Sequence, residues 1–225
     1  MKALNYILSG VLTLFATSCG DGWLDLDSST EIPSEGSLER LSDFQYALNG
    51  IYSAMQNSDG YSGRITYYGD VTADDVQANG ATKRTGSYYL LKYTKDNAPS
   101  TLWQIPYQLT RNANIILEEI VNIPETEENK EERSDIIGQA LTIRALALFD
   151  LTRIYGYPYT KDSGASWGAC IVQDVRQIDS KPSRNTVAEC FDAIIKDLND
   201  AIPQLSPEFN FGKMNRWGAM TLLSR

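Results

Sequence analysis

Histidine is absent from the 225-residue sequence. Its absence excludes Ser–His and Cys–His nucleophile pairs and every metal site built on imidazole. Any catalytic chemistry would have to use carboxylates, tyrosine, lysine or arginine. Asp25 and Asp27 are spaced like the start of a calcium loop, but the glycine and closing glutamate of such a loop are missing. We therefore expect neither a metal nor a cofactor.

Basic residues are also in short supply. The chain has 20 lysines and arginines against 29 aspartates and glutamates, which gives a formal net charge of −9 and a pI near 4.6. A protein that binds nucleic acid needs a basic face to meet the phosphates. The balance of charge argues against a nucleic-acid partner.

The N-terminal apolar run, Tyr6–Phe15, is too short to cross a bilayer. It follows a single cation, Lys2, and leads through the small residues 16–18 to Cys19, which is the pattern of a cleaved export signal. The residues before Cys19 resemble a bacterial lipoprotein box, in which the cysteine becomes the acylated N-terminus. We predict a signal peptide at 1–18, a lipidated Cys19 and an acidic tether over 19–35. The alternative is an ordinary signal peptide with an incidental cysteine.

Cysteine occurs only three times. Lipidation of Cys19 leaves Cys170 and Cys190, which are able to form a disulfide in an exported protein. Cys190, however, falls on the apolar side of a predicted helix. We favour a core position for it over a bridge.

Apolar residues recur at helical spacing in five segments, which predicts a mainly α fold. These segments are 38–57, 102–121, 133–155, 187–202 and 215–225. Gly50 in the first segment is interpreted as a close-packing position, and Pro106 in the second predicts a helix start or a kink. Thr186 and Glu189 form a capping box before the fourth segment. The last four segments are expected to form antiparallel, tetratricopeptide-like helix pairs within a domain over 36–225, although their spacing is irregular and no strict repeat is present.

The segment 133–155 is apolar around about two-thirds of its circumference and is predicted to be the central helix. Ser134 is a candidate N-cap, and Gly156 is placed for a left-handed C-cap before Pro158. Arg144 interrupts the apolar arc and therefore needs a carboxylate or several carbonyls. A structural ion pair that fixes helix docking is favoured over a ligand-binding role.

Residues 58–100 have no helical periodicity and are rich in Gly, Asp, Asn, Ser and Tyr. We predict a loop-rich segment with short extended runs at 65–68 and 88–94. Aromatic faces and polar side chains of this kind suit sugar binding, because they meet C–H surfaces and hydroxyls respectively. The candidate ligand-binding residues are Asp74, Asn79, Arg84, Tyr88 and Tyr89. For any single tyrosine, packing of the segment onto the helices is the stronger interpretation.

Several short motifs follow one another in a recognisable order: Cys19, Trp23-Leu24-Asp25, Ala47–Tyr52, Trp103…Tyr107…Asn112–Leu117, Ile137–Ala140…Arg144–Leu146…Phe149–Leu151…Tyr155-Gly156, Asp197-Leu198…Ala201–Pro203 and Asn215–Ala219. This order resembles the N-terminal part of the SusD/RagB family, the nutrient-binding outer-membrane lipoproteins of Bacteroidetes-type bacteria. Gln139 stands where this pattern has a glutamate, which removes one possible partner of Arg144.

The resemblance implies a non-catalytic protein that binds oligosaccharides at the cell surface and delivers them to a TonB-dependent, SusC-like outer-membrane receptor. It also implies a lipid anchor in the outer membrane, and peptides rather than glycans as the ligand of some members. Family members are longer than this chain, and its last helix ends without a cap, so we expect a truncated protein.

Two other function classes stay open at this point. One is a helical-repeat adaptor that binds only another envelope protein. The other is a surface glycoside hydrolase that uses Asp74 and Asp75, although adjacent residues of an extended segment point in opposite directions.

Overall fold

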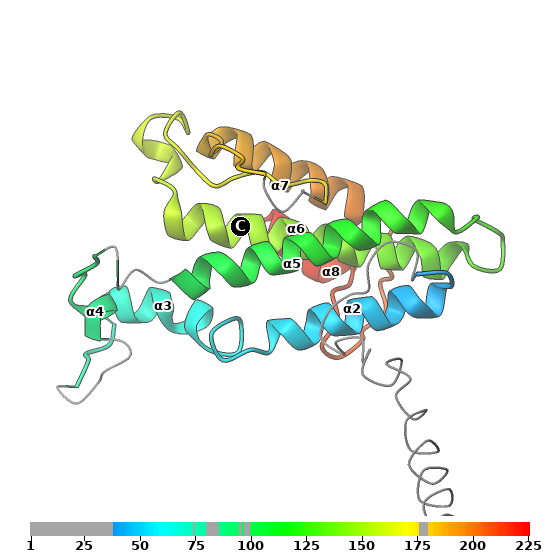
Figure 1. The fold of residues 1–225 in the computed structure, drawn as a ribbon, viewed down its shortest axis with the longest axis horizontal. Helices are drawn as coiled ribbons and strands as arrows, with labels where there is room; N and C mark the ends of the chain where they lie inside the picture. The colour runs from blue at the N-terminus through cyan, green and yellow to red at the C-terminus, as the bar shows by residue number, and fades with distance from the viewer. Residues whose placement is uncertain (1–37, 74, 80–85, 95, 97–99, 176–179) are drawn as a thin grey trace, which may run out of the picture. The chain divides into compact units, whose positions relative to one another are not determined.

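Helices dominate the computed structural model, which describes residues 38–73, 75–79, 86–94, 96, 100–175 and 180–225 (Figure 1). The predicted signal peptide, Cys19 and the tether lie outside the described residues. In chain order the elements are α2 (Leu41–Met55), α3 (Arg64–Thr72), α4 (Gly86–Tyr89), α5 (Ser100–Glu119), η2 (Ile120–Asn122), α6 (Lys130–Tyr155), η3 (Tyr159–Lys161), α7 (Val187–Ala201) and α8 (Arg216–Leu223). The predicted mainly α class is confirmed. No helix in this part of the chain is both long and apolar enough to cross a bilayer.

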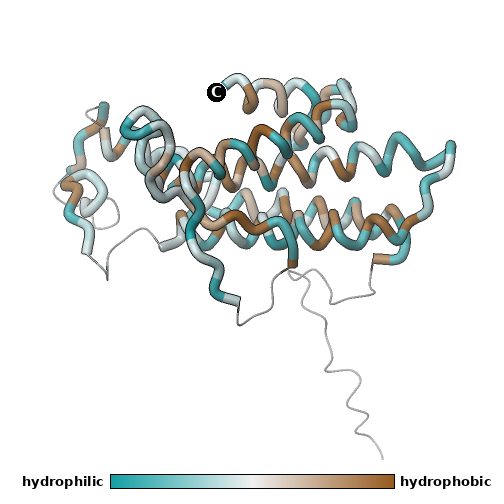
Figure 2. The backbone as a smooth tube through the Cα atoms, turned by 90° about the horizontal axis from the view of Figure 1, so that it is seen from above, coloured by the Kyte–Doolittle hydropathy of each residue, from teal (hydrophilic) through white to brown (hydrophobic). Residues whose placement is uncertain are grey.

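Helix α6 is the centre of the helical packing. It contacts α5, α7 and α2, and consecutive helices α5, α6 and α7 run antiparallel (Figure 1). Hydrophobic residues recur along these helices, whereas the connector between α5 and α6 is hydrophilic (Figure 2). Ala140, Ala145 and Ala147 are completely buried, which allows neighbouring helices to come close. The prediction of a single central helix covered by others is confirmed.

The ends of α6 differ from the sequence-based expectation. The helix begins at Lys130, one turn before Ser134, because Asn129 and Thr126 exchange side-chain hydrogen bonds that form a turn ahead of it. Gly156 follows the helix with an extended φ of −89° rather than a left-handed one. A Cβ at this position would lie 2.5 Å from the Thr152 carbonyl oxygen, so glycine is needed here because the backbone passes close to the last turn of the helix.

Helix α7 begins with the predicted capping box. The Thr186 hydroxyl accepts a hydrogen bond from the Glu189 N–H at 3.2 Å, and the Glu189 carboxylate accepts one from the Thr186 N–H at 2.7 Å. These hydrogen bonds satisfy N–H groups that have no partner within the helix, and they lower the pKa of Glu189. The apolar face that follows, including Ile194 and Leu198, is buried against α6.

Two interpretations of single residues need correction or refinement. Gly50 is exposed, and a Cβ built on it would meet nothing within 4 Å, so it is not a close-packing position. Helix α5 does not start at Pro106, because the proline lies inside it, six residues after Ser100; the alternative, a kink at Pro106, stays a prediction. Cys170 and Cys190 are free thiols, and Cys190 is completely buried, so the core interpretation is correct and the bridge is not.

The predicted extended run at 65–68 is wrong, because these residues form the first half of α3. The run at 88–94 is also not a strand: its first two residues close α4, and Leu91 has a left-handed φ of 52°. Isoleucine, threonine and tyrosine favour strands only when a neighbouring strand is available. Within the described residues the β-type pairing amounts to one isolated antiparallel bridge, between Trp167 and Thr186.

Candidate functional site: an aromatic groove at the end of helix α6

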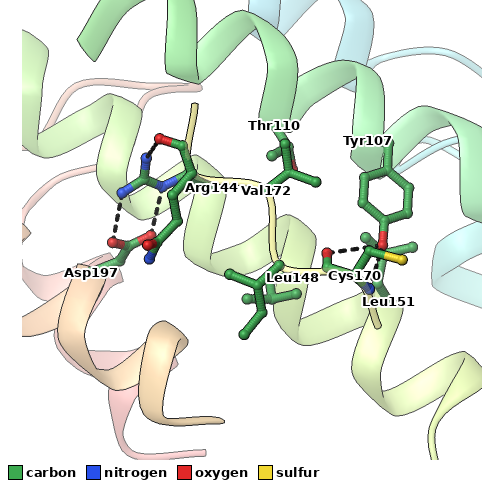
Figure 3. A pocket seen from close by; sticks show the side chains of 10 residues that line it. Tyr107, Thr110, Arg144, Leu148, Leu151, Cys170, Val172 and Asp197 are labelled. Carbon is green, nitrogen blue, oxygen red and sulfur yellow. Dashed lines mark hydrogen bonds and ion pairs between the residues drawn. The ribbon is translucent and has the colours of Figure 1, made fainter. Parts of the chain in front are cut away.

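Arg144, in the middle of α6, forms a two-pronged ion pair with Asp197 of α7 (Figure 3). Its Nε and Nη2 atoms each lie 2.7 Å from a carboxylate oxygen of Asp197. Its Nη1 donates to Asn114 of α5 at 2.9 Å, and the Asn114 amide donates onward to the carbonyls of Val172 and Asp174. The carboxylate that the sequence demanded is therefore present, and the network joins three helices and a loop.

This crevice is too small for an organic ligand. Its volume is about 10 Å³, which is room for one water molecule. The Tyr107 hydroxyl closes its far side by donating to the Cys170 carbonyl at 3.0 Å and accepting from the Cys170 N–H at 2.8 Å (Figure 3). The contacts of Arg144 support the structural interpretation.

Gln139, expected to remove a possible partner of Arg144, takes no part in this network. Its side-chain oxygen accepts a hydrogen bond from the Tyr52 hydroxyl at 2.7 Å, and its amide donates to Asp135 at 2.6 Å. The Tyr52 hydroxyl in turn accepts from the Met214 N–H at 2.9 Å. Gln139 thus holds α2 and the segment before α8 against α6.

A much larger groove lies where α6 ends. Its volume is about 610 Å³, within the range of small-molecule sites. Its lining comes from α3 and Leu91, which form the first wall, from the last turn of α6, and from the loop after α6 with α7, which form the second wall. The lining residues are Ile65, Tyr68, Gly69, Thr72, Leu91, Thr152, Arg153, Ile154, Gly156, Tyr157, Pro158, Tyr159 and Phe191.

The α3 wall is fixed by the turn that precedes it. Arg64 pairs with Asp59 at 2.9 Å and donates to the Thr101 hydroxyl of α5 at 3.3 Å. A Cβ on Gly63 would lie only 2.0 Å from the Ser58 carbonyl oxygen, so the turn requires glycine there. These contacts hold the start of α3 against the start of α5.

Packed aromatic rings continue this anchoring. The Tyr88 ring meets Tyr68 edge to face at 5.7 Å and tilts against Tyr93 at 6.1 Å. Trp103 of α5 meets Tyr155 of α6 at 5.0 Å in the same edge-to-face manner. The rings hold α3 and α4 together, and α5 against the end of α6.

The residues predicted to bind ligand fall into two groups. Asp74 and Arg84 lie outside the described residues. Tyr88 is 5% exposed, and burial raises the pKa of its hydroxyl, so most of its ring serves packing. Asn79 is exposed and Tyr89 is half-buried, and neither lines the groove. Their role in binding stays a prediction.

The second wall contains tyrosines that are not among the predicted ligand-binding residues. Tyr157 and Tyr159 line the groove with 56% and 48% of their surface exposed, and the Lys161 ammonium lies 3.3 Å from the centre of the Tyr157 ring. The available signal was three tyrosines within five residues after the central helix, 155–159. In the sequence alone this run indicates the end of the central helix.

Arg153 is the one charged side chain among the described residues that line the groove. Its Nη2 atom lies 3.1 Å from Asp150, whose side chain is 6% exposed, while that of Arg153 is 46% exposed. Its guanidinium also covers the Phe149 ring at 5.2 Å. Burial raises the pKa of Asp150, although Tyr61 and Arg153 act in the opposite direction. The Tyr61 hydroxyl is buried beside this carboxylate without a well-formed hydrogen bond.

Flat aromatic faces, a threonine hydroxyl and a guanidinium suit the binding of a polar organic ligand. Within the described residues no cluster of three or more metal-ligating side chains occurs. The fold and the groove together make a helical scaffold with an aromatic-lined groove.

The chain belongs to the SusD-like family, whose model is described as "Starch-binding associating with outer membrane" and matches residues 22–225. It is 57% identical to a Bacteroides vulgatus protein solved as a candidate sugar-binding protein, with a TM-score of 0.81 over 84% of this chain and 42% of that one. A SusD superfamily structure from Bacteroides thetaiotaomicron is 36% identical, with a TM-score of 0.76 over 82% and 41%. SusD-like protein P25 of Formosa agariphila is 26% identical over 97% of this chain and 42% of its own length.

These comparisons confirm the predicted family and the tetratricopeptide-like helical fold. They also show that the chain spans about two-fifths of the length of these relatives.

Proposed function

We propose that this protein is a non-catalytic nutrient-binding lipoprotein that takes up oligosaccharides in the groove at the end of α6. The observation that carries the proposal is the 610 Å³ groove lined by Tyr68, Tyr157 and Tyr159. Sugar rings present C–H faces that stack on exposed tyrosines, and their hydroxyls bond to polar groups such as Thr72 and Arg153. Membership of a family described as starch-binding supports a glycan as the ligand.

The binding test is calorimetry with a panel of neutral and acidic oligosaccharides. Tyr157→Ala removes one stacking face and is expected to weaken the affinity about tenfold, because a buried aromatic contact contributes about 1–3 kcal/mol. Tyr46→Ala is the matched control, since Tyr46 is 71% exposed on α2, away from the groove. The proposal is wrong if no oligosaccharide binds, or if the two variants lose affinity equally.

The absence of catalysis has its own test. Chromatography of each bound oligosaccharide after long incubation is expected to recover it intact. Release of shorter products that depends on Asp74 and Asp75 would instead favour the hydrolase.

Lipid attachment at Cys19 and delivery to a SusC-like, TonB-dependent receptor complete the proposal. The family description supports an outer-membrane location. Labelling with radioactive palmitate is expected to mark the wild type and to fail in Cys19→Ala. A pull-down from outer membranes is expected to retain a large β-barrel receptor. A retained barrel without any sugar affinity would favour the adaptor instead.

A further inference from the structure

The charge of the groove is opposite in sign to that of the chain. The chain has a net charge of −9, yet none of the described lining residues is acidic and one, Arg153, is basic. A second cation, Lys161, lies against the outer wall over the Tyr157 ring. The described lining therefore has no negative charge that would repel an anionic ligand, and its guanidinium can donate hydrogen bonds to one.

Residues of its own helix fix the position of the Arg153 side chain. Its ion pair with Asp150 uses one N–H of the five that a guanidinium carries, and the Phe149 ring supports one of its faces. No other hydrogen bond joins it to the described part of the chain. Because Asp150 is 6% exposed and Arg153 is 46% exposed, a ligand in the groove meets the guanidinium and not the carboxylate.

We propose that the groove selects acidic oligosaccharides, with Arg153 binding the carboxylate of a uronate residue that stacks on Tyr157 or Tyr159. This inference rests on the proposed function, since it names the ligand class of the same groove. A uronate fits better than a neutral sugar because its planar carboxylate matches the two parallel N–H groups of a guanidinium. Fixing Arg153 before binding also reduces the entropy lost on binding.

The experiment compares acidic oligosaccharides with uncharged copies of themselves. Oligogalacturonates, oligomannuronates and oligoglucuronates are each titrated by calorimetry beside the carboxyl-reduced series of the same length. We expect at least one acidic series to bind about tenfold or more tightly than its reduced copy, as a charge-assisted hydrogen bond requires. This preference is expected to shrink as salt is raised, because the guanidinium is half-exposed.

Variants locate the effect on Arg153. Arg153→Gln is expected to remove the preference for the acidic series. Since this change leaves buried Asp150 without its cation, the double variant Asp150→Asn/Arg153→Gln is measured as well; it replaces the ion pair with two neutral amides. Lys130→Gln is the matched control, because it removes one exposed positive charge at the other end of α6, about 35 Å away.

The outcomes separate this inference from the proposed function. Equal affinity for acidic and reduced series would overturn the inference and leave the groove a neutral-glycan site. A preference that survives in the double variant, or that is lost in Lys130→Gln, would also overturn it. Failure of every sugar to bind would overturn the proposed function itself, and the inference with it.

Discussion

Two arginines of helix α6 form ion pairs with aspartates, and the two pairs have different surroundings. Arg144 and Asp197 have side-chain exposures of 11% and 4%, and two hydrogen bonds join them. Arg153 and Asp150 have exposures of 46% and 6%, and one hydrogen bond joins them. The two arginines are nine residues apart, so they project from opposite sides of α6 at positions separated by about 13 Å along its axis.

In the Arg144 pair both side chains are buried, which is typical of a structural ion pair. In the Arg153 pair only the carboxylate is buried, which leaves the arginine accessible for the ligand that we propose. The donors of Arg144 meet Asp197, Asn114 and the Gln173 carbonyl, and the adjoining crevice holds about one water. Within the described residues the hydrogen bond of Arg153 goes to its own helix, and the side chain faces a volume about sixty times larger. Four of the five N–H donors of Arg144 are used between helices, whereas Arg153 uses one and has four left for the ligand that we propose.

Removal of Asp197 is the strongest test of this contrast. Asp197→Ala leaves the Arg144 guanidinium buried without a counter-charge, which should lower the free energy of unfolding by about 3–5 kcal/mol. Urea unfolding followed by circular dichroism measures the loss.

The matched control lies three residues along the same helix. Lys196 and Asp200 form an exposed pair at 2.6 Å, so Asp200→Ala should change the stability little. If Asp197→Ala costs no more than Asp200→Ala, the Arg144 pair does not hold the helices together.

The sequence was informative where local signals and burial agree. The periodicity of α6 and the capping box of α7 depend on residues within one or two turns, so they could be predicted. Arg144 could be predicted to need a carboxylate, because no apolar helix face leaves a guanidinium unpaired. That Asp197 is the partner could not be predicted, since the two residues are 53 positions apart and only the docking of α7 on α6 joins them.

The groove was harder to predict for the same reason. Its walls come from α3, the end of α6 and α7, which meet only in the folded chain. Segment 65–68 looked extended because its residues have strand propensity, whereas contacts of the preceding turn with α5 set its helix. The candidate residues predicted from the sequence therefore lie within 58–100, and Tyr157 and Tyr159 are not among them.

A substitution at Gly63 tests whether the tight turn before α3 positions the first wall of the groove, as the Arg144–Asp197 pair positions the helices around the small crevice. Gly63→Ala places a Cβ against the Ser58 carbonyl oxygen, and the turn before α3 must shift. We expect a loss of about 1–3 kcal/mol in unfolding free energy, as for other overpacked sites, with weaker glycan binding.

Gly50→Ala is the control for Gly63→Ala. Gly50 is an exposed helix position with nothing within 4 Å of its Cβ, so alanine should raise the stability by up to about 1 kcal/mol. Equal effects of the two substitutions would show that the wall does not depend on the tight turn.

The smallest expected effect concerns Asp150, the buried half of the groove pair. Its pKa is raised above the usual aspartate value, chiefly by burial, so the folded state binds the proton more tightly than the unfolded state does. Asp150 therefore favours folding most at low pH, and this contribution is lost as pH rises from about 4 through the raised pKa. Glu189, whose pKa is lowered, has the opposite dependence, but it is common to wild type and variant.

The measurement is the difference in unfolding free energy between wild type and Asp150→Asn from pH 4 to pH 7. Subtraction removes the groups that both proteins share. We expect the stability of the wild type relative to the variant to fall as pH rises and then to level off. A difference that is flat, or that grows with pH, would mean that Arg153 fully compensates the buried carboxylate. In that case the two Arg–Asp pairs of α6 would differ in the exposure of the arginine, but in both the arginine would fully offset the cost of burying the carboxylate.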